Sequence, residues 1–306
     1  MQSSHLLKRL ALLFLIVLTL STLALAGPYT GVVVYGDSLS DNGNLFNLIG
    51  YPPPPYFNGR FSNGPVAVEY LAQNLGVPLT DWAYGGATTG VGDIADGGTQ
   101  TTLGSLGIPG MTTTYLATVG SITPQMAASA LFMVWGGPND FESDGLSKAT
   151  ADRGVANLLG IVQGLQALGV QHILVPGMPD LGLTPELRNL GLGGVGTALS
   201  AYFDAELFAG LQGKGVLYFD TFDLTDDIVA NPAKYGFTDV VDPCFDGVNV
   251  CADPDKYLFW DDAHPTTAAH SILAAYFTAV ATPEPATLLM FGTGVIGMLG
   301  AARRRI

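Results

Sequence analysis

Cysteine and charged residues are both scarce in this sequence. Its 306 residues include only two cysteines, Cys244 and Cys251, and only 12% of the residues are charged. A zinc site at these cysteines is the weaker interpretation, because no second pair of cysteines or histidines accompanies them. Two cysteines this close together favour a local disulfide in an exported chain. Together with 48% hydrophobic residues, the low charge is typical of a globular protein rather than a disordered one.

Residues 1–26 have the three parts of a secretory signal peptide. Lys8 and Arg9 supply a basic start, an apolar run follows, and Ala-Leu-Ala at residues 24–26 matches the small-residue cleavage site. We therefore expect export from the cytoplasm and a mature protein that begins near Gly27. A buried first helix is the alternative for this segment.

Residues 282–306 form a second atypical end. A Thr-Pro-Glu-Pro sequence precedes an uncharged stretch at residues 286–302, and Arg303-Arg304-Arg305 follows. The stretch is at the short limit for a membrane span, and the arginines would hold its carboxyl end in the cytoplasm. The pattern resembles a PEP-CTERM sorting signal, which implies handling by an exosortase and display at, or release from, the surface of a Gram-negative-type bacterium. A plain carboxyl-terminal membrane anchor is the alternative.

Basic residues are few between these two ends. Residues 27–281 hold seven basic and 25 acidic residues, which give this part of the chain a net charge of −18. Binding to nucleic acid needs cationic side chains that meet the phosphates, so we expect no nucleic-acid partner. Anionic membrane surfaces should also repel this part of the chain.

Apolar, strand-like runs alternate with helical patterns through residues 27–281. Short apolar runs predict strands at residues 31–35, 79–83, 130–135, 172–176 and 216–220. Apolar residues at helical spacing predict helices at residues 65–75, 121–129, 149–168, 199–211 and 265–280. This alternation predicts one α/β domain in three α/β/α layers, with a central parallel sheet of about five strands.

Two segments interrupt this alternation. Residues 51–57 contain four consecutive prolines flanked by Tyr51, Tyr56 and Phe57, which predicts a stiff surface segment. Its aromatic side chains either line a substrate entrance or pack beneath the segment. Residues 90–114 are rich in Gly and Thr with little periodicity, and they predict a long loop. A loop of this length in a compact domain is more often functional than idle.

Candidate site residues follow the first three predicted strands. Ser38 comes after the first strand, Gly86 after the second and Asn139 after the third. Ligands of open parallel sheets bind at the carboxyl ends of the strands, which is where these residues lie. A serine at the mouth of a following helix gains from free backbone N–H groups and the helix dipole, and both favour an oxyanion. The alternative is that Ser38 only caps that helix.

A carboxylate and a histidine lie three residues apart in a turn before the last helix. From this position Asp261 can reach the Nδ1–H of His264, which fixes the tautomer and leaves Nε2 free to take a proton from a serine. Asp262 could replace Asp261, but the spacing favours Asp261. No acidic residue precedes His172 or His270 by three positions, and His270 is expected to be a surface or packing residue.

These motifs resemble the SGNH/GDSL hydrolases, a superfamily named for its Ser, Gly, Asn and His residues. Its four blocks are similar to residues 36–44, 83–88, 137–140 and 261–265, and the resemblance covers nearly all of residues 30–280. It implies that Ser38 is the nucleophile and that the oxyanion hole consists of the Ser38 and Gly86 N–H groups and the Asn139 side chain. It further implies that Asp261 orients His264, the base, and that no metal or cofactor takes part.

The resemblance implies a flavodoxin-like fold and an exported serine esterase or lipase. We expect a monomer that hydrolyses a lipid, a small ester or an acylated polysaccharide. The alternatives are a polysaccharide O-acetylesterase or acyltransferase with the same site, and an inactive surface binding protein. An ordinary α/β-hydrolase is disfavoured, because Ser38 lacks the second glycine of the nucleophile elbow. Asp81-Trp82 departs from the Asn-Phe of many relatives, so a supporting hydrogen bond could differ.

Overall fold

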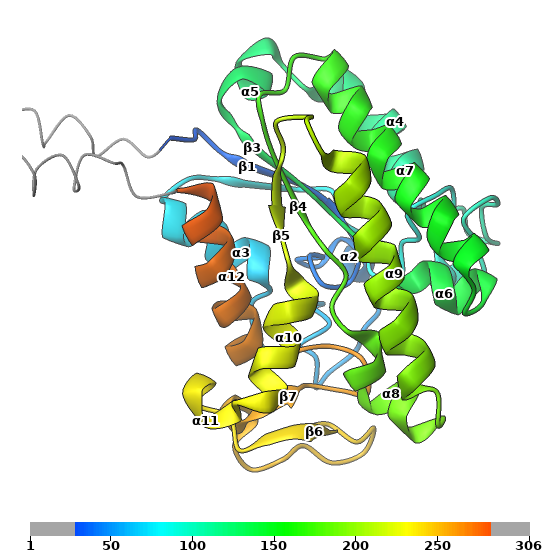
Figure 1. Cartoon of the computed structure of the whole chain (residues 1–306), viewed down its shortest axis with the longest axis vertical. Coiled ribbons are helices and arrows are strands. Elements are labelled where there is room, and N and C mark those ends of the chain that lie inside the picture. The colour runs from blue at the N-terminus through cyan, green and yellow to red at the C-terminus, as the bar shows by residue number, and fades with distance from the viewer. Residues whose placement is uncertain (1–27, 283–306) are drawn as a thin grey trace, which may run out of the picture.

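A five-stranded parallel sheet forms the centre of the computed structural model, which describes residues 28–282 (Figure 1). The predicted leader and the predicted tail beyond Thr282 lie outside these residues. The strands run in the order β2-β1-β3-β4-β5, and their bounds are β1 Val32–Gly36, β2 Leu79–Asp81, β3 Leu131–Trp135, β4 His172–Pro176 and β5 Leu217–Phe219. This flavodoxin-like order places the switch point between β1 and β3, and it confirms the predicted fold class.

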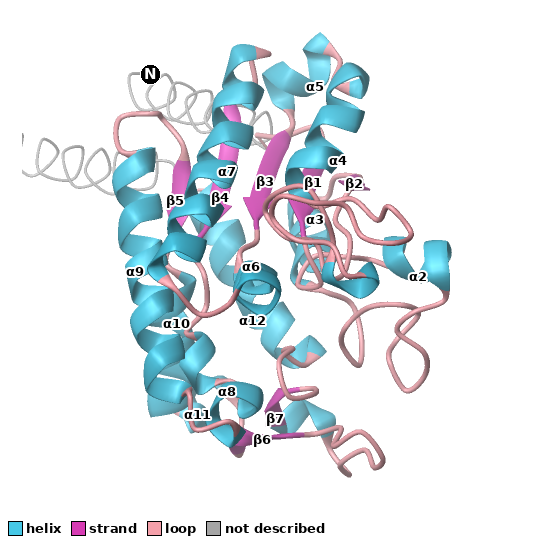
Figure 2. Ribbon diagram, turned by 90° about the vertical axis from the view of Figure 1, so that its right-hand side faces the viewer, coloured by secondary structure: helices cyan, strands magenta, loops and turns pink. Residues whose placement is uncertain are grey.

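Helices cover both faces of the sheet (Figures 1 and 2). One face carries α3 (Ala67–Leu75) and α12 (Thr267–Ala281), and α10 (Thr221–Ala230) joins the same core. The other face carries α4 (Met111–Thr118), α5 (Pro124–Ser129), α7 (Lys148–Ala167) and α9 (Gly193–Leu211). Successive side chains of a strand point to opposite faces, so Val32 packs in the first core and Val33 in the second. Burial on both faces explains why these strands are continuous apolar runs.

The sequence of α7 shows how local signals set the bounds of a helix. Ser147 caps its start by accepting a hydrogen bond from the Thr150 N–H at 3.1 Å. Leu158, Val162 and Leu165 recur at helical spacing and are fully buried in the core. The chain then turns away at Gly169, whose φ is +86°. Among the helices of residues 28–282, none is both long and apolar enough to cross a bilayer.

Short elements gather beyond the carboxyl ends of the central strands (Figure 1). They are α2 (Asn44–Ile49), α6 (Pro138–Asp144), α8 (Pro185–Asn189), α11 (Pro232–Tyr235), and a parallel pair formed by β6 (Asp239–Pro243) and β7 (Tyr257–Phe259). The connection between β6 and β7 contains a disulfide between Cys244 and Cys251, with an S–S distance of 2.10 Å. Short helices, the β6–β7 pair and the disulfide loop therefore cover this end of the sheet.

The structure corrects several secondary-structure predictions. Residues 111–114 belong to α4 rather than to the predicted loop, because buried Met111 joins the core. Helix α9 begins at Gly193, six residues before the predicted start at Leu199. Its glycine-rich first turn approaches another backbone segment closely, since a Cβ on Gly196 would lie 2.8 Å from the Gly182 nitrogen. Glycine predicts a loop, but here it permits tight packing.

Candidate active site

Ser38 lies in a tight turn directly after β1. The Asp37 carbonyl accepts hydrogen bonds from the N–H groups of Ser40 at 3.0 Å and Asp41 at 2.9 Å. These bonds close a turn, and the next helix, α2, begins only at Asn44. The prediction of a helix directly after Ser38 was wrong, and the alternative that Ser38 caps such a helix was wrong as well.

The Ser38 hydroxyl contacts the imidazole of His264. The distance from Ser38 Oγ to His264 Nε2 is 2.9 Å, and His264 Nδ1 lies 2.8 Å from Asp261 Oδ2. The other oxygen, Oδ1, lies 3.0 Å from the same Nδ1 and accepts the backbone N–H groups of Ala263 at 2.9 Å and His264 at 2.6 Å. The turn thus holds the carboxylate against Nδ1, so this nitrogen carries the proton and Nε2 faces the serine. Asp261, rather than Asp262, occupies the position beside the ring.

Burial and neighbouring charges shift the pKa of His264 in opposite directions, and the same holds for the pKa of Asp261. Burial lowers the pKa of the His264 imidazole, but nearby carboxylates, with Asp261 foremost, raise it by more, so the pKa lies above its ordinary value. Burial raises the pKa of the Asp261 carboxyl, but His264 and two backbone N–H groups lower it by more, so this pKa lies below its ordinary value. The surroundings therefore stabilise the imidazolium that forms when His264 accepts a proton.

Two backbone N–H groups without a partner among the described residues lie at the cavity beside Ser38. Within residues 28–282, the backbone N–H groups of Ser38 and Gly86 have no hydrogen-bond acceptor, and both residues line one cavity. The Asn139 amide donates to the Ala87 carbonyl, directly after Gly86, at 2.9 Å, although Asn139 lines neither cavity at Ser38. Gly86 has a φ of +91°, and a Cβ there would lie 2.5 Å from an Asp93 oxygen. Only glycine fits this position without strain.

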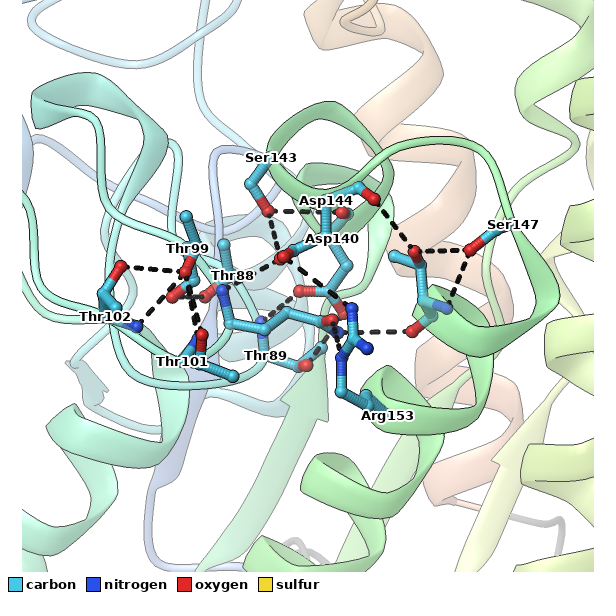
Figure 3. A network of polar contacts seen from close by, with 12 residues as sticks. Thr88, Thr89, Thr99, Thr101, Thr102, Asp140, Ser143, Asp144, Ser147 and Arg153 are labelled. Atoms are coloured by element: carbon cyan, nitrogen blue, oxygen red, sulfur yellow. Dashed lines mark hydrogen bonds and ion pairs between the residues drawn. The ribbon is translucent and has the colours of Figure 1, made fainter.

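Two buried carboxylates hold together the loops that carry these groups. Asp41 accepts the Gly85 N–H at 2.8 Å, which joins the turn after β1 to the loop after β2. Asp140 accepts the N–H and the hydroxyl of Thr89, both at 2.8 Å, and so joins the same loop to α6 (Figure 3). Burial raises the pKa of Asp140 to about 7. Neither role was predicted from sequence, because the partners are 44 and 51 residues away.

The predicted insert at residues 90–114 joins the same polar network (Figure 3). The Gln100 N–H donates to Asp144 at 3.1 Å, and the Gln100 side chain accepts a hydrogen bond from Arg153 Nε at 2.9 Å. These bonds join the insert to α6, which contains Asn139, and to α7.

Tyr56 makes a contact that the sequence does not reveal. Its hydroxyl donates to Asp261 Oδ2 at 2.8 Å, and its ring packs edge-on against Phe245 and Trp260. Phe245 directly follows the disulfide residue Cys244, so the disulfide loop supports the tyrosine. Of the three aromatic residues singled out in the proline-rich segment, Tyr51 and Tyr56 line a cavity at the site, whereas Phe57 does not line it.

The other residues singled out in the sequence lie away from Ser38. The ring of His172 packs edge-on against Tyr29. His270 is buried in α12, where Nδ1 accepts the Ala67 N–H at 3.2 Å and burial lowers its pKa to about 3. It is therefore a neutral packing residue. Asp81 accepts the N–H groups of Asn42 and Ala83, each at 2.9 Å, so the residue that departs from the family pattern also ties two motifs together.

Two cavities meet at Ser38 and His264. The first has a volume of about 280 Å³ and is lined mainly by aliphatic and aromatic side chains between α6, α8, α10 and α12. The second, of about 570 Å³, contains Tyr51, Tyr56 and several carboxylates. Glu142 and Glu186 line both cavities. No group of three potential metal-ligating side chains is close enough to hold an ion within residues 28–282.

Residues 32–277 match the GDSL-like lipase/acylhydrolase family, and residues 281–305 match the PEP-CTERM protein-sorting motif. The chain is 29% identical over 278 residues to the thermolabile hemolysin of Vibrio parahaemolyticus, and this alignment covers 79% of the chain but only 62% of the hemolysin. It is 25% identical over 319 residues to the phosphatidylcholine-sterol acyltransferase of Aeromonas hydrophila, covering 86% of the chain and 93% of the acyltransferase.

A solved structure has the same fold. The crystal structure of a protein from Lactobacillus plantarum aligns with a TM-score of 0.50 and 16% identity, over 82% of this chain and 95% of that protein. The family match extends from β1 into α12 and includes the Ser38, Gly86, Asn139 and His264 motifs. This chain belongs to the GDSL-like lipase/acylhydrolase family, and its carboxyl end carries the PEP-CTERM sorting motif.

Proposed function

We propose that this protein hydrolyses carboxylic esters through a Ser38-His264-Asp261 triad. The observation that carries the proposal is the continuous contact from Ser38 Oγ to His264 Nε2 at 2.9 Å and from His264 Nδ1 to Asp261 at 2.8 Å. Ser38 Oγ attacks the acyl carbon while His264 Nε2 takes its proton. His264 then protonates the departing alkoxide, and an acyl group remains on Ser38. Water attacks this acyl group, with His264 again as base, and the free acid and Ser38 are regenerated.

The tetrahedral intermediate carries an oxyanion that needs donors. We assign the N–H groups of Ser38 and Gly86 and the free amide N–H of Asn139 to this role. Donors that are fixed before the reaction stabilise developing charge without reorganisation. All of these groups come from one chain, which supports a monomer as the active form.

Replacing Asn139 by alanine should lower kcat by about 10²- to 10³-fold, because one oxyanion donor is lost. KM should change much less, since the ground-state carbonyl is a weaker acceptor than the oxyanion. Steady-state kinetics on p-nitrophenyl acetate measure both values. Turnover close to that of the wild-type protein would exclude Asn139 from the oxyanion hole.

The PEP-CTERM motif indicates export and sorting to the cell envelope. We propose that residues 1–26 are a cleaved signal peptide and that an exosortase-type enzyme handles the carboxyl-terminal segment, which lies in the membrane before processing. Acyl transfer is a second candidate activity, since the chain covers 93% of a relative named as an acyltransferase. An acyltransferase would give the acyl group to an added alcohol in preference to water, and product analysis with and without glycerol distinguishes the two.

The pH dependence of kcat/KM should follow the protonation of His264. The base must be neutral to accept the serine proton, so activity rises as pH increases through the His264 pKa. This pKa lies above its ordinary value of about 6.5, so half-maximal activity is expected above that pH. A profile of kcat/KM from pH 5 to 9 measures it, and a midpoint clearly below 6.5 would contradict the influence of Asp261 on His264.

We assign Tyr56 as a positioning residue for Asp261. Its hydroxyl donates to Oδ2, the Asp261 oxygen nearer to His264 Nδ1, so Tyr56→Phe leaves more of the carboxylate charge to the imidazole and should raise the His264 pKa. We expect kcat/KM to fall about 10-fold, as for loss of one hydrogen bond to a charged group, and the acid limb to move to higher pH. Tyr51→Phe is the matched control, because Tyr51 lines the same cavity without this bond. An unmoved acid limb in Tyr56→Phe would rule out the positioning role.

The experiment that tests the proposed function compares ester hydrolysis by the purified full chain and by its Ser38→Ala variant. Release of p-nitrophenol from acetate, butyrate and octanoate esters should depend on Ser38. A folded wild-type protein without activity on any ester would favour the surface binding protein.

A further inference from the structure

The two cavities at Ser38 differ sharply in chemistry. The smaller, at about 280 Å³, is close to the lower end of the range for ligand pockets, roughly 300 Å³. Its walls include buried Trp135, Ile228, Leu258 and Leu273, and it also reaches Leu190, which is 63% exposed. It therefore extends from the nucleophile through the core to the protein surface, and it offers mainly hydrocarbon to a ligand. We refer to it as the apolar cavity.

Apart from Glu142 and Glu186, where the two cavities meet, and the Thr221 hydroxyl, the polar side chains that line the apolar cavity are mostly hydrogen-bonded within the protein. Asp180 accepts hydrogen bonds from the Gly182 N–H at 2.8 Å and the Thr197 hydroxyl at 2.9 Å. The Thr184 and Thr225 hydroxyls donate to backbone carbonyls within their own turns, at 2.7 Å and 2.8 Å. A hydrocarbon chain bound there removes few polar groups from water, so its burial is favourable.

The larger cavity suits a different part of a substrate. It is lined by Asp261, Asp262, Glu142 and Glu186 together with Tyr51 and Tyr56, and we refer to it as the polar cavity. Glu142 and Glu186 lie where the two cavities meet, whereas Asp261 and Asp262 line the polar cavity alone, and burial raises the pKa of Asp262. An alkyl chain placed in the polar cavity would take Asp262 further out of water at a substantial cost. Both cavities border His264, where the water for deacylation must enter.

We propose that the apolar cavity binds the acyl chain of a medium- to long-chain ester and that the polar cavity receives the alcohol and then the attacking water. The proposal rests on ester hydrolysis at Ser38. During deacylation the acyl chain stays on Ser38, so only the cavity that the alcohol vacates can deliver water to His264. The preferred substrates are then esters with at least several acyl methylenes, and acetyl esters are poor ones.

Two substrate series with the full chain separate the cavities. In p-nitrophenyl esters from acetate to decanoate, kcat/KM should rise by up to about fourfold per added methylene until the cavity is filled. In alkyl acetates from ethyl to octyl, where only the alcohol lengthens, it should change little. A preference for octyl acetate over p-nitrophenyl octanoate would place the alcohol in the apolar cavity and overturn the assignment.

A larger side chain in the apolar cavity should change the preference for acyl chain length. Thr225 on α10 is half-buried and lines the apolar cavity, so Thr225→Phe should lower the ratio of octanoate to acetate hydrolysis at least 10-fold. Ala230→Phe is the matched control, because Ala230 is exposed on the same helix and lines neither cavity. An unchanged ratio in Thr225→Phe would contradict the proposal.

Different results would contradict the esterase activity and the assignment of the acyl chain to the apolar cavity. Serine-dependent hydrolysis that is flat across the acyl series would overturn the acyl cavity and leave the esterase standing. Absence of serine-dependent hydrolysis on every ester would overturn the esterase. Calorimetry with decanoate on the Ser38→Ala variant tests the cavity without turnover: we expect binding that Thr225→Phe weakens at least 10-fold, and no heat of binding would overturn the cavity assignment.

Discussion

Replacing Ser38 by alanine is expected to lower kcat about 10⁶-fold and to leave the melting temperature nearly unchanged. The large loss follows because covalent catalysis has no substitute nucleophile at this position, and removal of such a serine in other hydrolases has an effect of this size. The small effect on stability follows from the contacts of the side chain. Its only hydrogen bond within residues 28–282 goes to His264, which keeps its second partner, Asp261.

Kinetics and thermal unfolding of the same preparation test this prediction. Ser38→Thr is a useful companion, because it keeps a hydroxyl while crowding the turn. Activity of Ser38→Ala within 10-fold of wild type would contradict a nucleophilic role. A fall in melting temperature of many degrees would instead indicate that Ser38 mainly stabilises the turn after β1.

Replacing Asp261 by asparagine is expected to lower kcat about 10⁴-fold. The two backbone N–H groups that bond to Asp261 Oδ1 would keep the asparagine oxygen in place, so its NH₂ would take the position of Oδ2, the oxygen nearer to His264 Nδ1. The imidazole would then carry its proton on Nε2, where it cannot accept the serine proton. Loss of the carboxylate also removes the main influence that raises the His264 pKa, so the residual activity should have its acid limb at lower pH.

The matched variant for this prediction is Asp262→Asn. Asp262 is adjacent in sequence and lines the same polar cavity, but it does not contact the imidazole. It should reduce activity far less than Asp261→Asn. Equal losses in the two variants would mean that the charge of the loop, rather than the contact with Nδ1, supports His264. The double variant Ser38→Ala/Asp261→Asn should be no slower than Ser38→Ala, because residues that act as one unit are not additive.

The strands of the sheet could be predicted well, because the sequence pattern that identifies each strand lies within that strand. A parallel strand that is buried on both faces is a short apolar run, as in residues 131–135, and no long-range contact is needed to recognise it. The start of α9 could not be predicted, because its glycines favour a loop until Gly182 packs against them. The β6–β7 pair was missed for a similar reason: β6 is an exposed, irregular strand whose partner lies beyond the disulfide loop.

The same distinction applies to the candidate site. The proximity of Asp261 to His264 follows from a spacing of three residues in a turn, so the sequence could suggest it. Tyr56 is 205 residues from Asp261, and its sequence context indicates only a stiff aromatic segment. Asp41 and Asp140 lie within recognised motifs, yet their task of joining separate loops appears only once the fold brings Gly85 and Thr89 to them.

The central claim is that Ser38 is a nucleophile activated by His264. Its most direct test is covalent trapping with a fluorophosphonate, followed by mass spectrometry of the digested full chain. We predict a single phosphonylated residue, Ser38, with labelling that is lost in Ser38→Ala and slowed at least 100-fold in His264→Ala. Labelling at another residue, or none in a protein that is folded by circular dichroism, would contradict the claim.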